Sequence, residues 1–140
     1  MLIRPAVATD VEAMHTIRLR VRENRLSDPC VVKESDYHDF LARRTMSWVC
    51  EVEGVLTGFV MVDLEKRNLW ALFVAPEHEF KGIGQALHDT MTAAYFERID
   101  TLRLSTAPNT RAAQFYRKAG YTEIGPTADG RELIFERLRP

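Results

Sequence analysis

The stretch from Leu69 to Tyr95 places the strongest constraint on how this chain can fold. An apolar run over 69–74 ends at Ala75-Pro76, a short charged loop leads to Gly82-Ile83-Gly84, and apolar residues then recur at helical spacing. Strand, glycine loop and helix in this order bring the unpaired N–H groups of the first helical turn together, where the helix dipole adds partial positive charge. The pattern predicts an anion site near Gly82. A turn that only connects a strand with a helix has the same pattern.

Length and composition narrow the class of protein. The chain has 140 residues, of which 46% are hydrophobic, so we expect one domain over residues 1–140 with a buried core. A formal net charge of −1 gives no general attraction to nucleic acid or to an anionic membrane, and we expect neither as a partner. No apolar run approaches the roughly 20 residues that a membrane span needs.

Metal and export signals are missing from the sequence. The two cysteines, Cys30 and Cys50, and the four histidines have no metal-ligand spacing, so we expect no metal site and two free thiols. The opening segment, Met1 to Pro5, lacks the apolar region of about 7–15 residues that a signal peptide carries. We therefore expect a cytoplasmic protein.

The first half of the chain predicts a strand, two helices and three strands. A short strand over 1–4 precedes a helix capped by Thr9 or Asp10, and Asn24 to Pro29 carries turn chemistry. Ser35 is the expected cap of a second helix over 36–44. Period-two patterns then predict strands over 48–52, 58–64 and 69–74, and the short turns between them imply antiparallel neighbours.

The second half alternates helices and strands. A helix runs from near Gly82 to near Arg98, a strand covers 101–106, and Asn109 to Gly120 reads as a helix with Gly120 as its stop. Two strands, 121–124 and 133–138, end the chain. The order β-α-α-β-β-β-α-β-α-β-β predicts an α+β fold with a mixed sheet, in which the strands at 69–74 and 101–106 run parallel.

Two segments together resemble the GCN5-related N-acetyltransferase (GNAT) superfamily. The first is Glu79-Phe80-Lys81-Gly82-Ile83-Gly84, which follows Val74-Ala75-Pro76 and is similar to the family signature Gln/Arg-x-x-Gly-x-Gly/Ala. The second, Asn109 to Tyr121, fits Asn-x-x-Ala-x-x-Phe-Tyr-x-x-x-Gly-Phe/Tyr at each of those positions. The resemblance covers nearly the whole chain in element order and implies the GNAT-like acyl-CoA N-acyltransferase fold.

The resemblance implies that acetyl-CoA is the co-substrate. In the family its pyrophosphate lies on the N–H groups of the glycine loop, which agrees with the anion site predicted above. Its pantetheine arm pairs with the strand before the loop, where a neighbouring parallel strand diverges, and Ser105, Thr106 and Asn109 would line the far side. The implied cofactor-binding residues are Leu72, Phe73, Val74, Glu79, Phe80, Lys81, Gly82, Ile83, Gly84, Gln85, Asn109, Ala112 and Phe115.

Two residues of the second segment have a structural and a functional interpretation. Periodicity alone favours Tyr116 as a core aromatic residue, whereas the signature around it implies a general acid. Acetyl transfer from a thioester expels a thiolate, whose thiol has a pKa of about 8.5, and a phenol can hydrogen-bond and protonate it. Asn109 can cap the helix, contact the cofactor, or both.

The chain departs from the family pattern in the glycine loop and in the general base. Glu79 stands where Gln or Arg is usual, and Phe80 where Gly is frequent. A carboxylate near a pyrophosphate predicts weaker CoA binding, which Lys81 offsets in part. The strand over 69–74 holds no carboxylate, and no base is assigned; the acids considered are Asp63, Glu65, Glu23, Asp28, Glu34 and Asp36.

Two functions from different classes remain open. The first is an N-acetyltransferase that moves the acetyl group of acetyl-CoA directly to an amine, expected to be a small molecule because the chain is compact and has no basic patch. The second is a catalytically weak acyl-CoA-binding sensor or interaction module, which the missing base and Glu79 leave open. Many relatives dimerise, so the resemblance also allows a homodimer.

Overall fold

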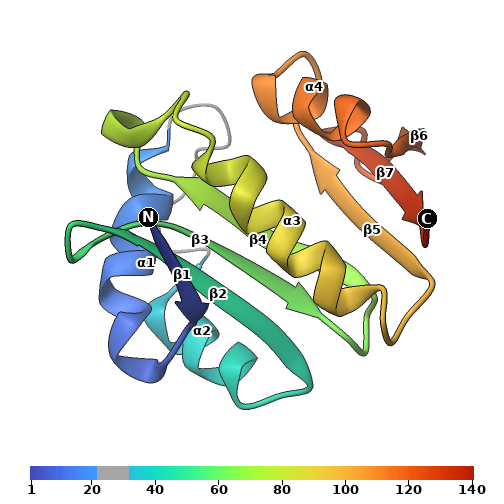
Figure 1. Ribbon diagram of the computed structural model, residues 1–140. Helices are drawn as coiled ribbons and strands as arrows, with labels where there is room; N and C mark the ends of the chain where they lie inside the picture. The colour runs from blue at the N-terminus through green and yellow to red at the C-terminus, as the bar shows by residue number, and fades with distance from the viewer. Residues whose placement is uncertain (22–31) are drawn as a thin grey trace.

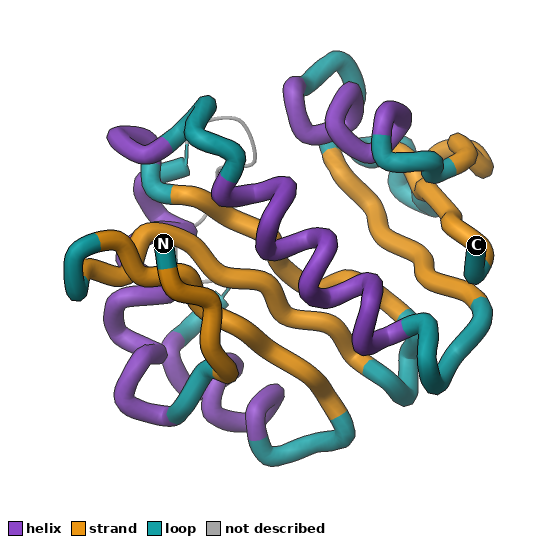
Figure 2. Tube along the Cα trace, viewed as in Figure 1, coloured by secondary structure: helices purple, strands orange, loops and turns teal. Residues whose placement is uncertain are grey.

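Seven strands form one mixed sheet in the order β1-β2-β3-β4-β5-β7-β6 (Figures 1 and 2). The structure is a computed structural model that describes residues 1–21 and 32–140. The strands are β1 (Leu2–Pro5), β2 (Thr45–Val52), β3 (Val55–Asp63), β4 (Asn68–Val74), β5 (Thr101–Thr106), β6 (Thr122–Pro126) and β7 (Leu133–Leu138). The helices are α1 (Val11–Arg20), α2 (Glu34–Leu41), α3 (Ile83–Tyr95) and α4 (Arg111–Lys118), with 3₁₀ turns η1 (Ala8–Asp10) and η2 (Pro76–His78). The predicted element order is confirmed.

Both faces of the sheet are covered, and alternating residues of β3 supply both cores. Val60 and Val62 pack with α3, α4 and β5, whereas Phe59 and Met61 pack with α1 and α2. Figure 1 shows α3 across the front of the sheet, with α1 and α2 behind it. A strand that is buried on both faces reads as a continuous apolar run, which explains the composition of β3.

The sheet parts between β4 and β5. β3 and β4 pair antiparallel along almost their whole length, from Gly58 opposite Val74 to Asp63 opposite Asn68. The parallel pairing of β4 with β5 is recorded only at Asn68 and Arg103, so the predicted parallel pair is confirmed at one end and diverges beyond it. Figure 1 shows the two strands separating toward α4. The divergence leaves the β5-facing edge of β4 without a strand partner.

A bulge in β4 lies beside this opening. The register shifts between Met61 and Val62, whose partners are Ala71 and Leu69, so Trp70 is left without a partner residue on β3. A bulge bends a strand and re-aims its side chains. Trp70 accordingly packs against Tyr37 and Phe40 of α2, with ring centroids 5.4 and 4.9 Å away.

Two predicted helix caps need correction, and a third is confirmed in position only. The cap of α4 is Thr110, whose Oγ1 accepts the N–H of Ala113 at 3.1 Å, while Asn109 lies one residue earlier with φ 58°. Position 35 falls inside α2, which begins at Glu34 and has Lys33 as its cap residue. Asp10 is the N-cap residue of α1, as one of the two predicted alternatives, but its side chain makes no cap hydrogen bond, because its carboxylate binds Arg4 and the N–H of Val7. The turn expected over Asn24 to Pro29 lies outside the described residues.

The ion pair between Arg4 and Asp10 should be a measurable part of the stability. Both guanidinium Nη atoms reach the two oxygens of Asp10 at 2.9 Å, and this arginine lowers the pKa of the carboxyl group. Asp10 is only 8% exposed, so Asp10→Asn should lower the free energy of unfolding by about 2 kcal/mol in urea titrations. Asp100→Asn is the control, since its pair with Arg67 is exposed and should change stability by less than about 0.5 kcal/mol. Equal losses in both variants would contradict this account.

Candidate functional site

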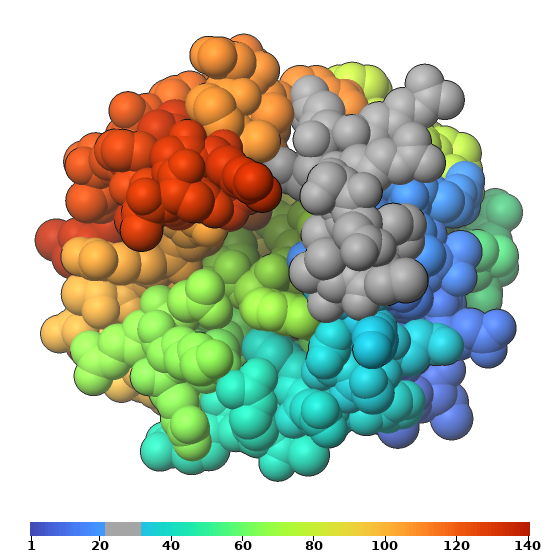
Figure 3. Space-filling model, turned by 180° about the vertical axis from the view of Figure 1, so that it is seen from behind, coloured from blue at the N-terminus to red at the C-terminus, as the bar shows by residue number. Residues whose placement is uncertain are grey.

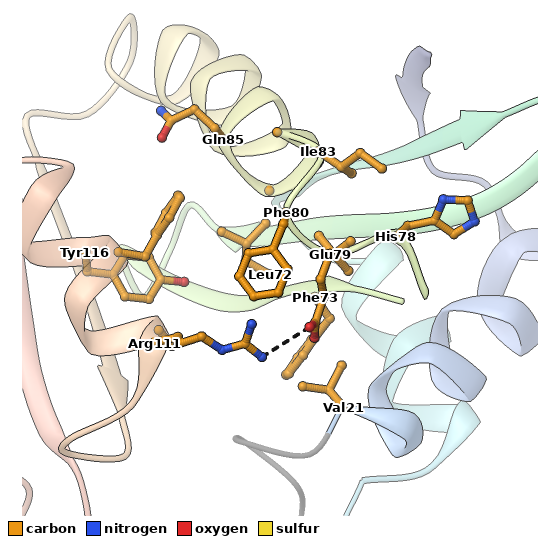
Figure 4. Close-up of a pocket in the computed structure, with 15 residues that line it drawn as sticks. Val21, Leu72, Phe73, His78, Glu79, Phe80, Ile83, Gln85, Arg111 and Tyr116 are labelled. Carbon is orange, nitrogen blue, oxygen red and sulfur yellow. Dashed lines mark hydrogen bonds and ion pairs between the residues drawn. The ribbon is translucent and has the colours of Figure 1, made fainter. Parts of the chain in front are cut away.

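A cavity of about 400 Å³ opens where β4 and β5 separate. Its walls come from the end of β4, the loop before α3, the first turn of α3, and α4 (Figure 4). The lining residues are Val21, Leu72, Phe73, Val74, His78, Glu79, Phe80, Gly82, Ile83, Gly84, Gln85, Arg111, Ala112, Phe115 and Tyr116. The cavity therefore joins the two sequence segments that carry the family resemblance.

Two glycines shape the loop side of this cavity. Gly82 is the N-cap of α3 and has φ 81°, a left-handed conformation that a residue with a Cβ adopts only at a cost. Gly58 of β3 allows a close approach, because a Cβ there would lie 3.0 Å from the Phe73 carbonyl oxygen and 3.1 Å from Leu87 Cδ1. The first residue turns the chain into α3, and the second lets α3 lie close on the sheet.

The start of α3 has the properties of an anion site. The first helical bond near it runs from the N–H of Ala86 to the carbonyl of Gly82, so the N–H groups of Ile83, Gly84 and Gln85 have no intrahelical acceptor. The first turn of the helix holds no acidic residue. Three free donors and the positive end of a helix that runs from Ile83 to Tyr95 fit a phosphate group of CoA.

The β4 edge of the cavity offers backbone groups as well. The N–H of Ala75 donates to the carbonyl of Thr57 beside β3 at 2.8 Å. Because successive amides of a strand point to opposite edges, the N–H groups of Leu72 and Val74 point away from β3, into the opening. An amide chain such as the pantetheine arm can pair with them as an additional strand would.

The carboxylate of Glu79 is paired across the cavity. Its Oε2 lies 3.2 Å from Nη2 of Arg111, the first residue of α4, and the Arg111 guanidinium carbon is 4.9 Å from the ring centroid of Phe80 (Figure 4). The cation paired with Glu79 is thus Arg111, and the expectation that Lys81 offsets the effect of Glu79 on pyrophosphate binding stays a prediction. Phe80 itself is 87% exposed, with φ 62°.

Tyr116 stands at the inner end of the cavity. Its side chain comes from α4, and Figure 4 shows the hydroxyl pointing toward β4. Burial raises the pKa of this phenol, so the hydroxyl stays protonated at neutral pH. It forms no hydrogen bond with any residue of the two described segments, 1–21 and 32–140. A buried hydroxyl that faces a cavity without an internal partner is available to a ligand.

A buried aromatic cluster holds Tyr116 in place. Its ring packs edge-on against Phe115 and Tyr121 at centroid distances of 5.3 and 5.2 Å, and it also contacts His88. His88 of α3 is fully buried, and its Nε2 lies 2.8 Å from the Tyr121 hydroxyl. The cluster joins α3 to α4, so the position of Tyr116 depends on contacts that the signature residues alone do not reveal.

A second cavity of about 270 Å³ reaches Tyr116 from another side. It shares Leu72, Phe73 and Tyr116 with the first cavity, and its wall includes the bulged Trp70. Viewed from behind, Figure 3 shows a recess between the light-green atoms that follow β3 and the orange and red atoms of β5 and β7. The remaining lining residues are Arg18, Asn68, Leu69, Ala71, Leu104, Ser105, Thr106 and Glu132. Tyr116 is thus accessible from two separate spaces.

The structure brings most of the predicted cofactor residues together, with two exceptions. Lys81 and Asn109 are exposed and line neither cavity. Ser105 and Thr106 line the second cavity instead of the first. Whether each predicted residue binds the cofactor stays a prediction.

Of the acids considered as a base, the four that lie in the described residues line neither cavity. Asp63 is 2% exposed and is occupied by Arg43 and by the N–H groups of Glu65 and Lys66, so it holds the β3–β4 turn. Glu34, Asp36 and Glu65 also lie outside both walls, and Glu23 and Asp28 fall outside the described residues.

Sequence reasoning missed three charged residues of the site. Arg18 belongs to a run of basic residues in the first predicted helix, a pattern that favours a solvated face over an edge that meets an acidic group of a ligand. Arg111 lies inside the second signature, at a position that the signature does not specify. Glu132 follows a glycine turn before the last strand, and no local pattern marks it.

Neither a metal cluster nor a membrane span is found in the described part of the chain. No group of three or more His, Cys, Asp or Glu side chains there is placed to hold a metal ion. Among the same residues, no helix combines the length and the apolar character needed to cross a bilayer.

Three features together are typical of an acyl-CoA-dependent acyltransferase. They are the separated β4–β5 pair, the anion site at the start of the next helix, and the free tyrosine hydroxyl on the helix after that. Residues 43–123 match the family described as "Acetyltransferase (GNAT) domain". The chain therefore belongs to the GNAT family of acetyl-CoA-dependent N-acetyltransferases, and the resemblance stated from the sequence is confirmed. No curated protein sequence matches the chain.

Solved structures show the same fold. The ribosomal-protein-S18-alanine N-acetyltransferase of Escherichia coli aligns with a TM-score of 0.81 at 23% identity, over 99% of this chain and 93% of that one. The PaiA N-acetyltransferase of Thermoplasma acidophilum, in complex with coenzyme A, gives 0.83 at 19% identity over 98% of both chains. An aminoglycoside 6′-N-acetyltransferase complexed with coenzyme A gives 0.78 at 16% identity, over 100% of this chain and 98% of that one. The GNAT-like fold is confirmed.

His88 should make the stability of the protein pH-dependent. Its pKa is lowered from 6.5 to about 4, chiefly by burial and further by Arg137. As the pH falls through this window, the unfolded chain takes up a proton that the folded protein does not, so the free energy of unfolding falls. Denaturant titrations should show that, from about pH 7.5 to pH 4.5, the free energy of unfolding of His88→Gln falls by about 2–3 kcal/mol less than that of the wild type.

The exposed His38 provides the control for this experiment. His38→Gln should keep the wild-type dependence on pH. A His88→Gln variant whose stability falls as steeply as that of the wild type would show that His88 is not the group responsible.

Proposed function

We propose that this protein transfers the acetyl group of acetyl-CoA directly to the amine of a small molecule, with both substrates bound at once. The observation that carries the proposal is the free Tyr116 hydroxyl, which lines both cavities. One cavity offers the N–H groups at the start of α3 and on β4 to the cofactor, and the other offers space to an acceptor. An amine that enters by the second cavity meets the thioester beside Tyr116.

The order of the chemistry follows from this arrangement. The amine nitrogen forms a bond to the thioester carbonyl carbon, the carbon–sulfur bond breaks, and the sulfur leaves with the electron pair. Tyr116 donates a hydrogen bond to the leaving sulfur. Because burial raises the pKa of the phenol while a thiol has a pKa of about 8.5, complete proton transfer from Tyr116 is uphill. The proton that the amine loses balances the one that the thiolate takes up to become the free thiol. Tyr116 stabilises the negative charge that develops on the leaving sulfur.

No Ser-His-Asp or Cys-His arrangement was found in the sequence, which agrees with direct attack. Among the described residues, the single free cysteine is Cys50, which is fully buried and packs with residues of α3 and β3. It lines neither cavity, so it supports no acetyl-cysteine intermediate.

Tyr116→Phe should lower turnover and leave cofactor binding intact. A hydrogen bond to a charged group contributes about 1.5–3 kcal/mol, so we expect kcat to fall by about 10- to 10²-fold. Thiol release from acetyl-CoA measures kcat, and calorimetry with CoA measures affinity, which should change by less than about threefold. Tyr95→Phe is the matched control, because its hydroxyl donates to the Thr101 carbonyl at 2.6 Å, away from both cavities.

Unchanged turnover in Tyr116→Phe would remove this residue from the mechanism. Tight CoA binding by the wild type with no thiol release over a broad amine panel would favour the other function, an acyl-CoA-binding sensor.

Glu79→Gln should tighten CoA binding. The substitution removes a negative charge from the cavity wall and leaves the positive charge of Arg111 beside the phosphate site. We expect the dissociation constant for CoA to fall about three- to tenfold at low salt, and the gain to shrink as salt screens the charges. Glu77→Gln is the control, since it makes the same charge change at an exposed residue outside both cavities. Equal or weaker binding by Glu79→Gln would count against an electrostatic penalty from Glu79.

A further inference from the structure

Arg18 of α1 places a partly buried positive charge in the wall of the second cavity. Its guanidinium carbon lies 5.0 Å from the ring centroid of Trp70 and 5.1 Å from that of Phe73. The atoms Nε and Nη1 are inaccessible to solvent and have no hydrogen-bond partner in the described structure. Buried guanidinium donors without an acceptor are costly and stacking on two rings offsets only part of that cost, so an anion beside Arg18 would stabilise this arrangement.

No group of the described protein neutralises Arg18. Residues 1–21 and 32–140 contain no ion pair that involves it. Tyr37 interacts with Arg18, which lowers the pKa of the phenol, but it does not supply a negative charge, because burial outweighs this effect and raises that pKa to about 12. Among the described residues that line this cavity the acid is Glu132, and it does not pair with Arg18.

Glu132 gives the same cavity a negative end. It precedes β7, and its Oε1 accepts the Ser105 hydroxyl of β5 at 3.0 Å. This single hydrogen bond leaves acceptor capacity on the carboxylate. The second cavity therefore has a positive charge from Arg18 on its α1 side and a negative charge from Glu132 on its β5 and β7 side. Tyr116 lies on the wall that the two cavities share.

We propose that the second cavity binds a small amine that also carries a carboxylate, such as an amino acid, with the carboxylate on Arg18 and the ammonium group toward Glu132. The inference rests on the proposed function, because it names the acceptor class of that same site. A carboxylate in the cavity pairs with the positive charge of Arg18, and the contacts with Trp70 and Phe73 hold the planar guanidinium group at the cavity wall. A volume of about 270 Å³ suits a molecule of amino-acid size.

The test compares each of the common L-amino acids with its α-amide, which keeps the amine and loses the carboxylate. With the wild type and acetyl-CoA, kcat/KM measured by thiol release should be about 10- to 100-fold higher for the best acid than for its amide. Arg18→Gln should reduce the ratio of the two kcat/KM values to about threefold or less. Arg18→Lys should restore part of the preference, since it keeps the charge and loses the planar guanidinium group that stacks on the two rings.

Two further variants separate the charges of the cavity. Glu132→Gln should raise KM for acids and amides alike, because both ligands carry the ammonium group. Arg20→Gln is the matched control on α1, since Arg20 pairs with the exposed Glu77 and lines neither cavity. It should keep the wild-type preference for acids.

A binding measurement separates this inference from the proposed function. Calorimetry with the CoA-saturated protein measures the affinity for each acid and amide without any turnover. If the wild type binds acids more tightly than amides and Arg18→Gln loses this difference, the subsite is supported even when no thiol is released. In that case only the proposed reaction is wrong. Equal turnover of acids and amides overturns the subsite and leaves the reaction standing. If peptides that carry an acidic side chain are better substrates than every free amino acid, the inference that the acceptor is a small molecule is wrong.

Discussion

The separation of β4 from β5 is the constraint on which the rest of the structure depends. Parallel strands that stayed paired would satisfy each other's backbone groups and leave no opening in the sheet. Here the recorded pairing is limited to Asn68 and Arg103, so the far end of β4 keeps free N–H groups and both cavities form beside it. An exposed strand edge is usually a liability, and we propose that the amide chain of the cofactor covers this one.

The elements around the opening divide the work of binding by charge. The first turn of α3 offers N–H groups to phosphate, and Arg111 adds a cation that Glu79 holds across the cavity mouth. On the other side of Tyr116, Arg18 and Glu132 place opposite charges in the smaller cavity. Each of these groups comes from a different element, which explains how a chain with a net charge of −1 can hold a strongly polar site.

Local patterns predicted the fold because each level of the sequence agreed with the next. The period-two runs of β3 and β4, the glycine at position 82 and the helical spacing after it all point to the same topology. Helix caps were less predictable, since Thr110 and Asn109 are both good cap residues and only the backbone decides between them. The roles of Arg18 and Glu132 in the site could not be predicted from the sequence, because only the tertiary arrangement of α1, β5 and β7 brings both residues to the wall of one cavity.

Amide hydrogen exchange of β4 tests the central claim most directly. Leu72 and Val74 have N–H groups that point into the opening, whereas the N–H of Ala75 already donates to Thr57 and serves as an internal reference. If CoA pairs with the free edge, its addition should slow exchange at Leu72 and Val74 by at least about tenfold, together with the N–H groups at the start of α3. Saturating CoA that slows exchange at the start of α3 and leaves Leu72 and Val74 unchanged would contradict the account.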